Sequence, residues 1–299
     1  MKVSILIPAF HAEAFIATAL ESVRAQTHQN WEVVVVEDGS HDHTQAIVTD
    51  FARSCPQNVV YDNLGENRGV GTVRNRLLEL AKGDALAFLD ADDTWDEAHL
   101  ANAIAEIRSG ADVVVSGVRT FDLVKRRALE QVLPPPALVH DPVLTLFRNS
   151  VIVTSSCVVL TRAIAAKTGV FDTSLRIGED RDYWLRCALE GARFKVTDAF
   201  TCHYAKHISS SMARTHIVAQ HVIRFYEKYQ NLTVVPARLR RHLLARSLIC
   251  MGRLLRDQDR SRSAACLWRA WQCEPFNPLI PVHLAVTRWR SGPPAAKAA

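Results

Sequence analysis

The sequence predicts an α/β protein, built as a doubly wound, mostly parallel sheet with a helical C-terminal extension. Short β-branched runs alternate with helical segments through the first 116 residues. From His216 onward the chain is instead rich in Leu, Arg and Ala at helical spacing. The length of 299 residues is enough for one large α/β domain and a smaller appendage.

The first half contains five predicted strands with a helix predicted in each of the four gaps between them. The run from Trp31 to Glu37 is continuously apolar, which is typical of a strand buried on both faces. Strands that alternate with crossover helices form parallel sheets, whose ligands bind outside the carboxyl ends of the strands. We predict strands at 3–7, 31–37, 58–61, 85–89 and 112–116, and helices at 12–25, 42–52, 70–81 and 96–107.

The second half begins after a loop marked by Pro134–Pro136. We predict a strand over residues 153–160 and a helix over 180–190, followed by tail helices that include 242–256 and 261–273. The predicted domains are therefore 1–212, with halves at about 1–116 and 117–212, and a basic helical extension over 213–299.

Composition and charge narrow the class of protein. The hydrophobic fraction is 48% and the charged fraction 22%, which is ordinary for a globular protein. We expect no spanning helix and read the N-terminus as a strand rather than a signal peptide, so a cytoplasmic location is expected. The seven cysteines form no CxxC pair, as in a reducing compartment. Residues 214–299 hold 15 Lys or Arg against 4 Asp or Glu, a net charge of +11, whereas the first 213 residues carry 21 against 27, or −6.

Three acidic clusters follow predicted strands or precede a helix: EDGS at Glu37–Ser40, DADD at Asp90–Asp93 and GED at Gly178–Asp180. Each alone fits a turn or a helix cap. Crowded carboxylates repel one another, so three clusters at one sheet edge favour a bound cation. Beside them, Gly69 and Gly71 lie at the mouth of a helix that favours an anion, and Arg74 could fork onto a phosphate. Arg76 fits a solvated face.

Five segments together resemble family 2 of the inverting glycosyltransferases: SILIPAFHAE, EDGS, ENRGVGTVRN, FLDADD and GEDRDYWLR, in that order and at about the family spacing. The resemblance covers about residues 1–212. It implies the GT-A fold and the transfer of a sugar from a nucleoside diphosphate, most often UDP, to an acceptor hydroxyl in polysaccharide or glycolipid biosynthesis. Mn²⁺ or Mg²⁺ is the implied cofactor.

The resemblance also implies roles for the residues that bind the donor. Asp38 would accept a hydrogen bond from the base, and Arg74 would help to hold the nucleotide. Asp93 would either position the sugar or cap the next helix. The other implied positions are Pro8, Phe10 and Glu13 around the base and ribose, Asp90 towards the ribose and Asp92 on the metal.

On the acceptor side, Asp180 matches the general base and Glu179 the acceptor-site carboxylate. Trp184 matches a residue lining the acceptor pocket, although a tryptophan there also fits the core. The segment His203–Ser211 resembles the closing loop of the family, from which His207 would reach the metal. Two positions depart from the family pattern: His11 stands where Asn is common, and Ala205 where Arg is usual, with Lys206 as a substitute cation.

Two other functions fit parts of the sequence. Leu86–Thr94 also satisfies the nucleophile motif of haloacid-dehalogenase-type phosphatases, with Asp90 as the nucleophile, but that motif normally follows the first strand. A non-catalytic nucleotide-binding or scaffold protein is the second alternative. No motif supports nucleic-acid binding. The tail arginines could face anionic lipid, with a lipid-linked saccharide as acceptor, or form a solvated face: Arg238, Arg240, Arg241, Arg246, Arg253 and Arg256.

Overall fold

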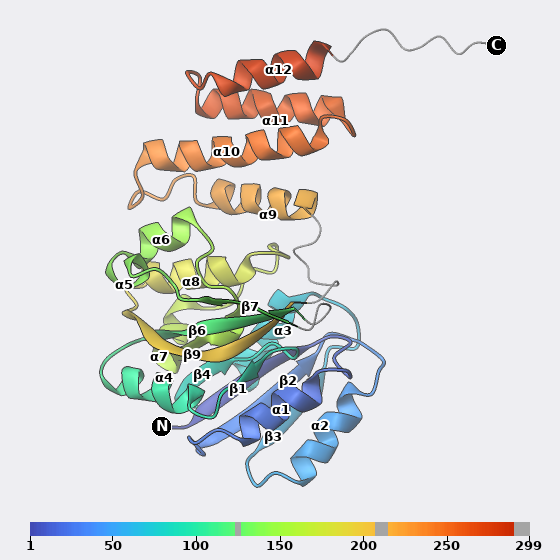
Figure 1. Ribbon diagram of the computed structural model, residues 1–299, viewed down its shortest axis with the longest axis vertical. Coiled ribbons are helices and arrows are strands. Elements are labelled where there is room, and N and C mark those ends of the chain that lie inside the picture. The colour runs from blue at the N-terminus through green and yellow to red at the C-terminus, as the bar shows by residue number, and fades with distance from the viewer. Residues whose placement is uncertain (123–126, 207–214, 290–299) are drawn as a thin grey trace, which may run out of the picture. The chain divides into compact units, whose positions relative to one another are not determined.

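The computed structural model describes residues 1–122, 127–206 and 215–289 (Figure 1). The chain divides into two compact units, Met1–Ser210 and Ser211–Ala299. We describe each unit by itself.

The N-terminal unit is built on one sheet, to which nine strands of the described residues contribute. Its first half is parallel, in the order β3 (Val59–Asn63), β2 (Trp31–Glu37), β1 (Val3–Ala9) and β4 (Ala85–Phe88). The predicted alternation of strands and crossover helices is thus observed. Every residue of β2 is buried, as its continuous apolar run predicts.

The second half of the sheet is mixed. The strand β8 (Val158–Thr161) pairs antiparallel with both β4 and β6 (Val113–Asp122). Next to β6 lies β9 (Phe194–Lys206), which runs parallel to it and pairs at the edge with β5 (Thr94–Trp95). The strand β7 (Arg127–Val132) pairs with the far end of β6.

Two predictions for this half are wrong. Only the end of the predicted strand 153–160 is strand, because residues 155–157 form a 3-10 turn in which the Thr154 hydroxyl accepts the Ser156 amide. The segment predicted as a loop from His203 continues β9 as far as Lys206, since it pairs along β6. The rest of that loop, with His207, lies outside the described residues.

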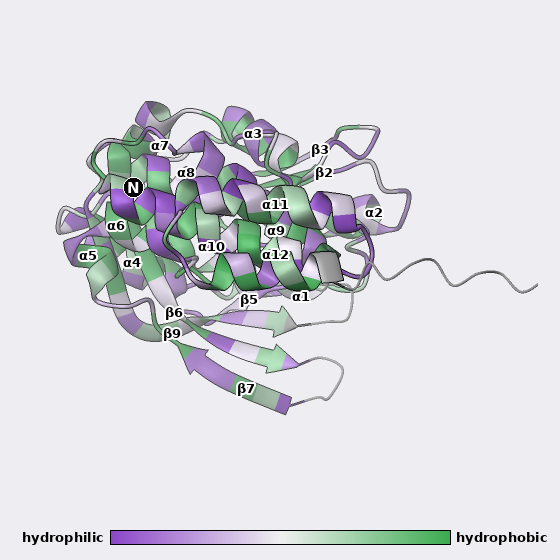
Figure 2. Cartoon of the chain, turned by 90° about the horizontal axis from the view of Figure 1, so that it is seen from above, coloured by the Kyte–Doolittle hydropathy of each residue, from purple (hydrophilic) through white to green (hydrophobic). Residues whose placement is uncertain are grey.

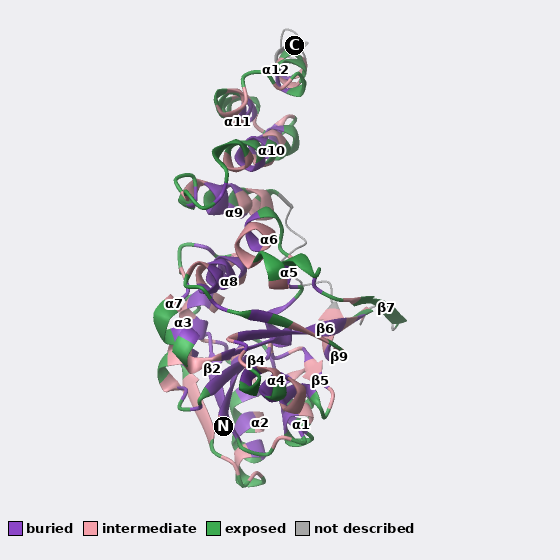
Figure 3. Cartoon of the chain, turned by 90° about the vertical axis from the view of Figure 1, so that its left-hand side faces the viewer, coloured by how far each residue is buried: buried purple, intermediate pink, exposed green. Residues whose placement is uncertain are grey.

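Helices cover both faces of the sheet (Figure 3). On one face lie α1 (Ile16–Arg24), α2 (Thr44–Arg53) and α4 (His99–Arg108). On the other lie α3 (Val70–Leu80), α7 (Arg162–Thr168) and α8 (Glu179–Leu189), while the short α5 (Ala137–His140) and α6 (Pro142–Arg148) follow β7. The doubly wound fold class is therefore confirmed, and it brings the ends of β1, β2 and β4 to one edge.

In its described residues, 215–289, the C-terminal unit contains four helices, and successive helices run antiparallel (Figure 1). They are α9 (Thr215–Lys228), α10 (Ala237–Leu255), α11 (Arg260–Cys273) and α12 (Leu279–Trp289), and each carries hydrophobic and hydrophilic residues side by side (Figure 2). At Gly252 an added Cβ would lie 2.9 Å from the Leu267 side chain, so α10 and α11 approach closely there. Among the described residues, no helix combines the length and apolarity needed to cross a bilayer.

Candidate active site

Asp38 joins two loops at the carboxyl edge of the sheet. Its side chain is 4% exposed and accepts the backbone amides of Arg68, at 2.7 Å, and Gly69, at 2.9 Å. Gly39 has φ +72°, and a Cβ there would lie 2.4 Å from the Glu66 backbone. The EDGS turn therefore packs directly on the loop that opens α3, and Asp38 holds that loop in place.

Residues at the end of β1 and just after it lie at the same edge and are more accessible. Pro8 is half-buried, and Phe10 follows the strand with 48% of its surface exposed. Glu13 accepts hydrogen bonds from the His43 amide at 3.1 Å and from its Nδ1 at 2.8 Å. His11 has φ +50°, the only positive φ of a non-glycine residue in the described part of the chain. Asn, Asp and His are the non-glycine residues enriched in this conformation, so His11 is compatible with the backbone of this turn.

The DADD motif directly follows β4, and its last carboxylate is the most enclosed. Asp93 is 1% exposed and accepts the hydroxyls of Thr154, at 2.9 Å, and Ser156, at 2.6 Å, and the amide of Ala205 at 3.1 Å. Burial, and then the carboxylates of Asp90 and Asp92, raise the pKa of Asp93 well above its ordinary value. Asp93 is no helix cap, because α4 begins after Ala98 without a side-chain cap.

Thr154 and Ser156 are site residues that the sequence did not reveal. Ser156 Oγ accepts the Asp90 amide at 2.9 Å, and the Thr154 hydroxyl lies 3.3 Å from Asp90 Oδ2. The β-branched residues of this segment favour a strand. The signal that could have indicated a polar turn instead is the run of three hydroxyl side chains, Thr154–Ser156, because such side chains bond to nearby backbone groups.

Arg74 connects the DADD and GED motifs. It lies in α3, is 4% exposed, and directs Nη1 to Glu179 Oε1 at 2.5 Å and Nη2 to Asp90 Oδ1 at 3.2 Å. Both terminal nitrogens of its fork are therefore engaged by carboxylates. Two motifs about ninety residues apart in sequence lie within reach of one side chain.

The GED motif opens α8. Gly178 is its N-cap with φ +79°, and the carboxylates of Glu179 and Asp180 lie in the first turn, where the helix dipole favours negative charge. Burial raises the pKa of Glu179 to about 7, with Arg74 opposing the shift and Asp180 adding to it. Asp180 is half-buried, and its Oδ1 accepts the Arg181 amide at 2.6 Å.

Trp184 belongs to the core of the unit. It is 1% exposed and packs edge-on against Phe88, with ring centroids 5.4 Å apart, and against Tyr183 and Phe171. Its side chain reaches no surface in this arrangement, so we leave it out of the acceptor site. The core alternative weighed for this tryptophan is the one that its burial supports.

The residues present suit a hard divalent cation that takes few ligands from the protein and keeps most of its bound waters. Asp90 and Asp92 offer carboxylate oxygens, and the Asp90 side chain is 29% exposed. Within the described ranges, no group of three or more His, Cys, Asp or Glu could hold a metal ion by itself. Mg²⁺ commonly binds through one or two carboxylates and completes its coordination with waters and substrate phosphates.

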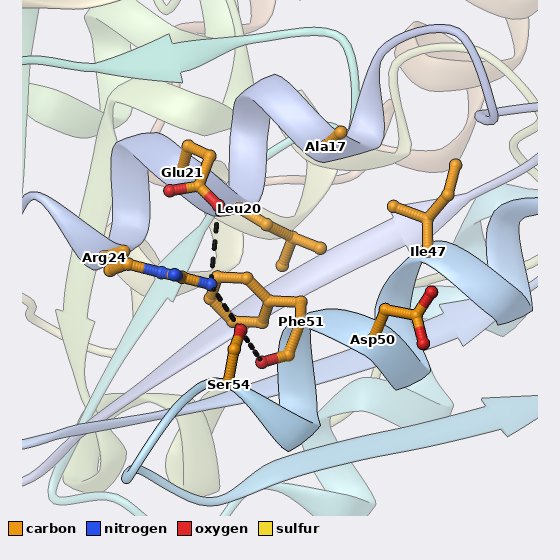
Figure 4. A pocket seen from close by; sticks show the side chains of 8 residues that line it. All are labelled: Ala17, Leu20, Glu21, Arg24, Ile47, Asp50, Phe51 and Ser54. Atoms are coloured by element: carbon orange, nitrogen blue, oxygen red, sulfur yellow. Dashed lines mark hydrogen bonds and ion pairs between the residues drawn. The ribbon is translucent and has the colours of Figure 1, made fainter.

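A separate shallow pocket lies between α1 and α2 (Figure 4). Arg24 crosses it, with its guanidinium 4.7 Å from the Phe51 ring centroid and a hydrogen bond of 2.9 Å to Ser54. None of the acidic motif residues lines this pocket, so it is no part of the candidate site.

Comparison with known proteins identifies the family. The model described as "Glycosyl transferase family 2" matches residues 4–168, more than half of the chain. The chain belongs to glycosyl transferase family 2. The predicted resemblance of the chain to this family is therefore confirmed, and the matched range contains the segments EDGS, ENRGVGTVRN and DADD. The DADD motif also follows the fourth strand, β4, and not the first, where a phosphatase nucleophile would lie.

Individual relatives also carry the names of glycosyltransferases. An Escherichia coli protein named UDP-Glc:alpha-D-GlcNAc-diphosphoundecaprenol beta-1,3-glucosyltransferase WfaP is 27% identical over 71% of this chain and 80% of its own length. Three other relatives, 35%, 41% and 39% identical, are matched over only 35%, 27% and 36% of their length, so this chain spans about a third of them.

Solved structures confirm the GT-A fold together with a helical C-terminal part. S. aureus TarS in complex with UDP-GlcNAc superposes with a TM-score of 0.69 at 20% identity, covering 97% of this chain and 88% of that one. The mannosyltransferase PcManGT from Pyrobaculum calidifontis, in complex with GDP-Man and Mn²⁺, gives a TM-score of 0.61 at 19% identity over 97% and 88% of the two chains.

Proposed function

We propose that this protein transfers a sugar from a nucleoside diphosphate, of the UDP class, to a hydroxyl of a lipid-linked saccharide, with inversion at the anomeric carbon. The observation that carries the proposal is the Arg74 bridge, 2.5 Å from Glu179 and 3.2 Å from Asp90. It brings the proposed donor and acceptor carboxylates to one place, as a single displacement requires.

On the donor side, the exposed ring of Phe10 and the neighbouring Pro8 and Glu13 offer a surface for the base and ribose. The Asp38 amide donates to the carbonyl of Ala9 at 2.9 Å, which places it beside the end of β1, and its carboxylate oxygens retain lone pairs beyond the two amides that they accept. We assign Asp90 to the ribose side. Arg74 would act on the nucleotide by orienting Asp90, since its fork is already engaged.

Asp92 would hold Mn²⁺ or Mg²⁺, with His207, outside the described residues, as a further ligand. When bound, the ion would stabilise negative charge on the departing diphosphate. PcManGT, a structural neighbour, was solved in complex with GDP-Man and Mn²⁺. Asp93 would keep the motif in position through the hydroxyls of Thr154 and Ser156, because its own side chain is 1% exposed.

Asp180 would take the proton of the acceptor hydroxyl as that oxygen attacks the anomeric carbon. Its half-buried carboxylate lies in the first turn of α8, beside the buried Glu179. General-base assistance of this kind contributes about 10²–10⁴-fold in rate. No enzyme nucleophile is needed, so the configuration would invert.

The acceptor class is supported by WfaP, whose name gives a diphosphoundecaprenol-linked sugar as substrate. An acceptor of that kind resides in a membrane, so we propose peripheral association with the cytoplasmic face through the basic C-terminal helices. Their charge of +11 over residues 214–299 suits an anionic surface.

The test is a donor screen followed by two substitutions. Thermal shift with Mn²⁺ and a panel of nucleotide-sugars should identify a donor that raises the melting temperature. Asp180→Asn should then abolish transfer while leaving donor binding intact, whereas Asp92→Ala should weaken metal-dependent donor binding. Asp50→Asn, an exposed aspartate on α2, is the matched control. Transfer by Asp180→Asn at the wild-type rate would refute the assignment.

A further inference from the structure

The C-terminal unit exposes apolar side chains in one short stretch. Of the thirteen large hydrophobic residues exposed among the described residues, six lie in this unit, which makes up about a quarter of those residues. Four of the six fall between positions 268 and 282: Trp268 is 53% exposed, Phe276 99%, Leu279 59% and Val282 57%. Such a density of exposed apolar side chains indicates an interaction surface.

The stretch has a defined place in the unit. Phe276 lies in the connection between α11 and α12, and Leu279 and Val282 lie one helical turn apart on the first part of α12. His242 Nδ1 lies 2.9 Å from Glu274 Oε1, and Asn277 Nδ2 donates to Glu274 Oε2 at 3.0 Å. The connection is therefore anchored to the N-terminal end of α10, and Phe276 projects from a held turn.

Arginines of α10 flank this stretch at both ends. Arg238 lies one helical turn before His242 on α10, and Arg241 directly precedes His242, whose Nδ1 lies 2.9 Å from Glu274 Oε1, so both arginines lie near the connection between α11 and α12. Further along, Arg256 Nη2 lies 3.0 Å from His283 Nδ1, next to Val282. Arg238 and Arg241 are exposed. Arg240, on the same helix, instead donates to the carbonyl oxygens of Leu232 and Val235 and so stabilises the unit.

We propose that the surface formed by Phe276, Leu279 and Val282, with Arg238 and Arg241 beside it, inserts into the headgroup region of an anionic bilayer. Apolar side chains flanked by cations match both parts of such a membrane, the acyl boundary and the negative headgroups. Trp268, stacked on Trp271 with centroids 5.0 Å apart, adds a residue type enriched at membrane interfaces. The inference rests on the proposed function, because a lipid-linked acceptor requires the enzyme at the membrane.

The experiment is flotation of the full chain with vesicles of phosphatidylcholine alone or mixed with phosphatidylglycerol. Wild type should float with the anionic vesicles only. Phe276→Ser/Leu279→Ser should weaken binding about tenfold or more, given the apolar area that it removes. Arg238→Gln/Arg241→Gln should weaken it by a similar factor, and more at low than at high salt.

Matched controls come from the N-terminal unit. Val170→Ser removes a side chain that is 65% exposed, and Arg53→Gln removes an exposed guanidinium, so both should bind vesicles like wild type. Unchanged flotation of both double variants would overturn the inference. So would a concentration-dependent dimer, seen by light scattering without vesicle binding and broken by Phe276→Ser/Leu279→Ser, because the surface would then be a subunit contact.

The outcome is separable from that of the proposed function. All variants should keep the thermal shift with the nucleotide-sugar, which needs no membrane. Vesicle binding without any nucleotide-sugar effect would refute the transferase proposal while leaving the docking surface in place. The reverse result would refute the docking surface alone.

Discussion

Arg74 offers the sharpest test of the site, because a second arginine on the same helix makes similar contacts at the surface. Arg74 is 4% exposed and bridges Glu179 and Asp90, whereas the Arg76 side chain is 41% exposed and bridges Asp62, at 2.6 Å, and Glu79, at 3.0 Å. Removing one partner of a buried ion pair costs about 3–5 kcal/mol, since the other charge stays buried. Removing one from a surface pair costs about 0–1 kcal/mol.

We therefore expect Arg74→Gln to lower the free energy of unfolding by about 3–5 kcal/mol and Arg76→Gln by less than about 1 kcal/mol. Urea unfolding followed by circular dichroism measures both, with the loss confined to the transition of the N-terminal unit. Without Arg74, the buried Glu179 is better neutral, so its folded pKa rises further above the ordinary 4.5. The folded state then binds the extra proton, and the penalty should be larger at pH 8 than at pH 5.

A second substitution separates unpaired charge from lost packing. In the Arg74→Gln background, Glu179→Gln removes the stranded carboxylate, so it should recover part of the lost stability, whereas it should destabilise the wild type. Equal losses for Arg74→Gln and Arg76→Gln, or no recovery in the double variant, would refute the bridge as the structural link between the two motifs.

Two further predictions concern the frame of the site. Burial lowers the pKa of His99 to about 3, so below about pH 6.5 the unfolded chain binds a proton that the folded chain does not. As the pH is lowered from about 6.5 to about 3, the free energy of unfolding should therefore fall by about 1.4 kcal/mol per pH unit. His99→Gln should remove that part of the slope in urea titrations; an unchanged slope would contradict it. Gly39→Ala should destabilise more than Gly65→Ala, because both have positive φ but only Gly39 faces backbone, at 2.4 Å, and equal losses in thermal unfolding would show that the contact does not matter.

Local pattern was enough to predict much of this protein. The continuous apolar run of β2, the alternation of strands and helices, and the acidic motifs after β2 and β4 are all short-range features, and each is observed where it was expected. Family membership followed from the same motifs, because their order and spacing are themselves properties of the sequence.

Only the tertiary structure determined which groups the polar side chains contact. The sequence separated Arg74 from a solvated Arg76, but only the fold shows that Arg74 is buried between Asp90 and Glu179. Thr154 and Ser156 were predicted to lie in a strand. In the fold, the Asp93 carboxylate that follows β4 accepts their hydroxyls, and its other oxygen accepts the Ala205 amide of β9. Trp184 resembled a pocket residue and is core. Burial and pairing depend on contacts between residues far apart in the chain, and a pattern read along one segment contains no record of them.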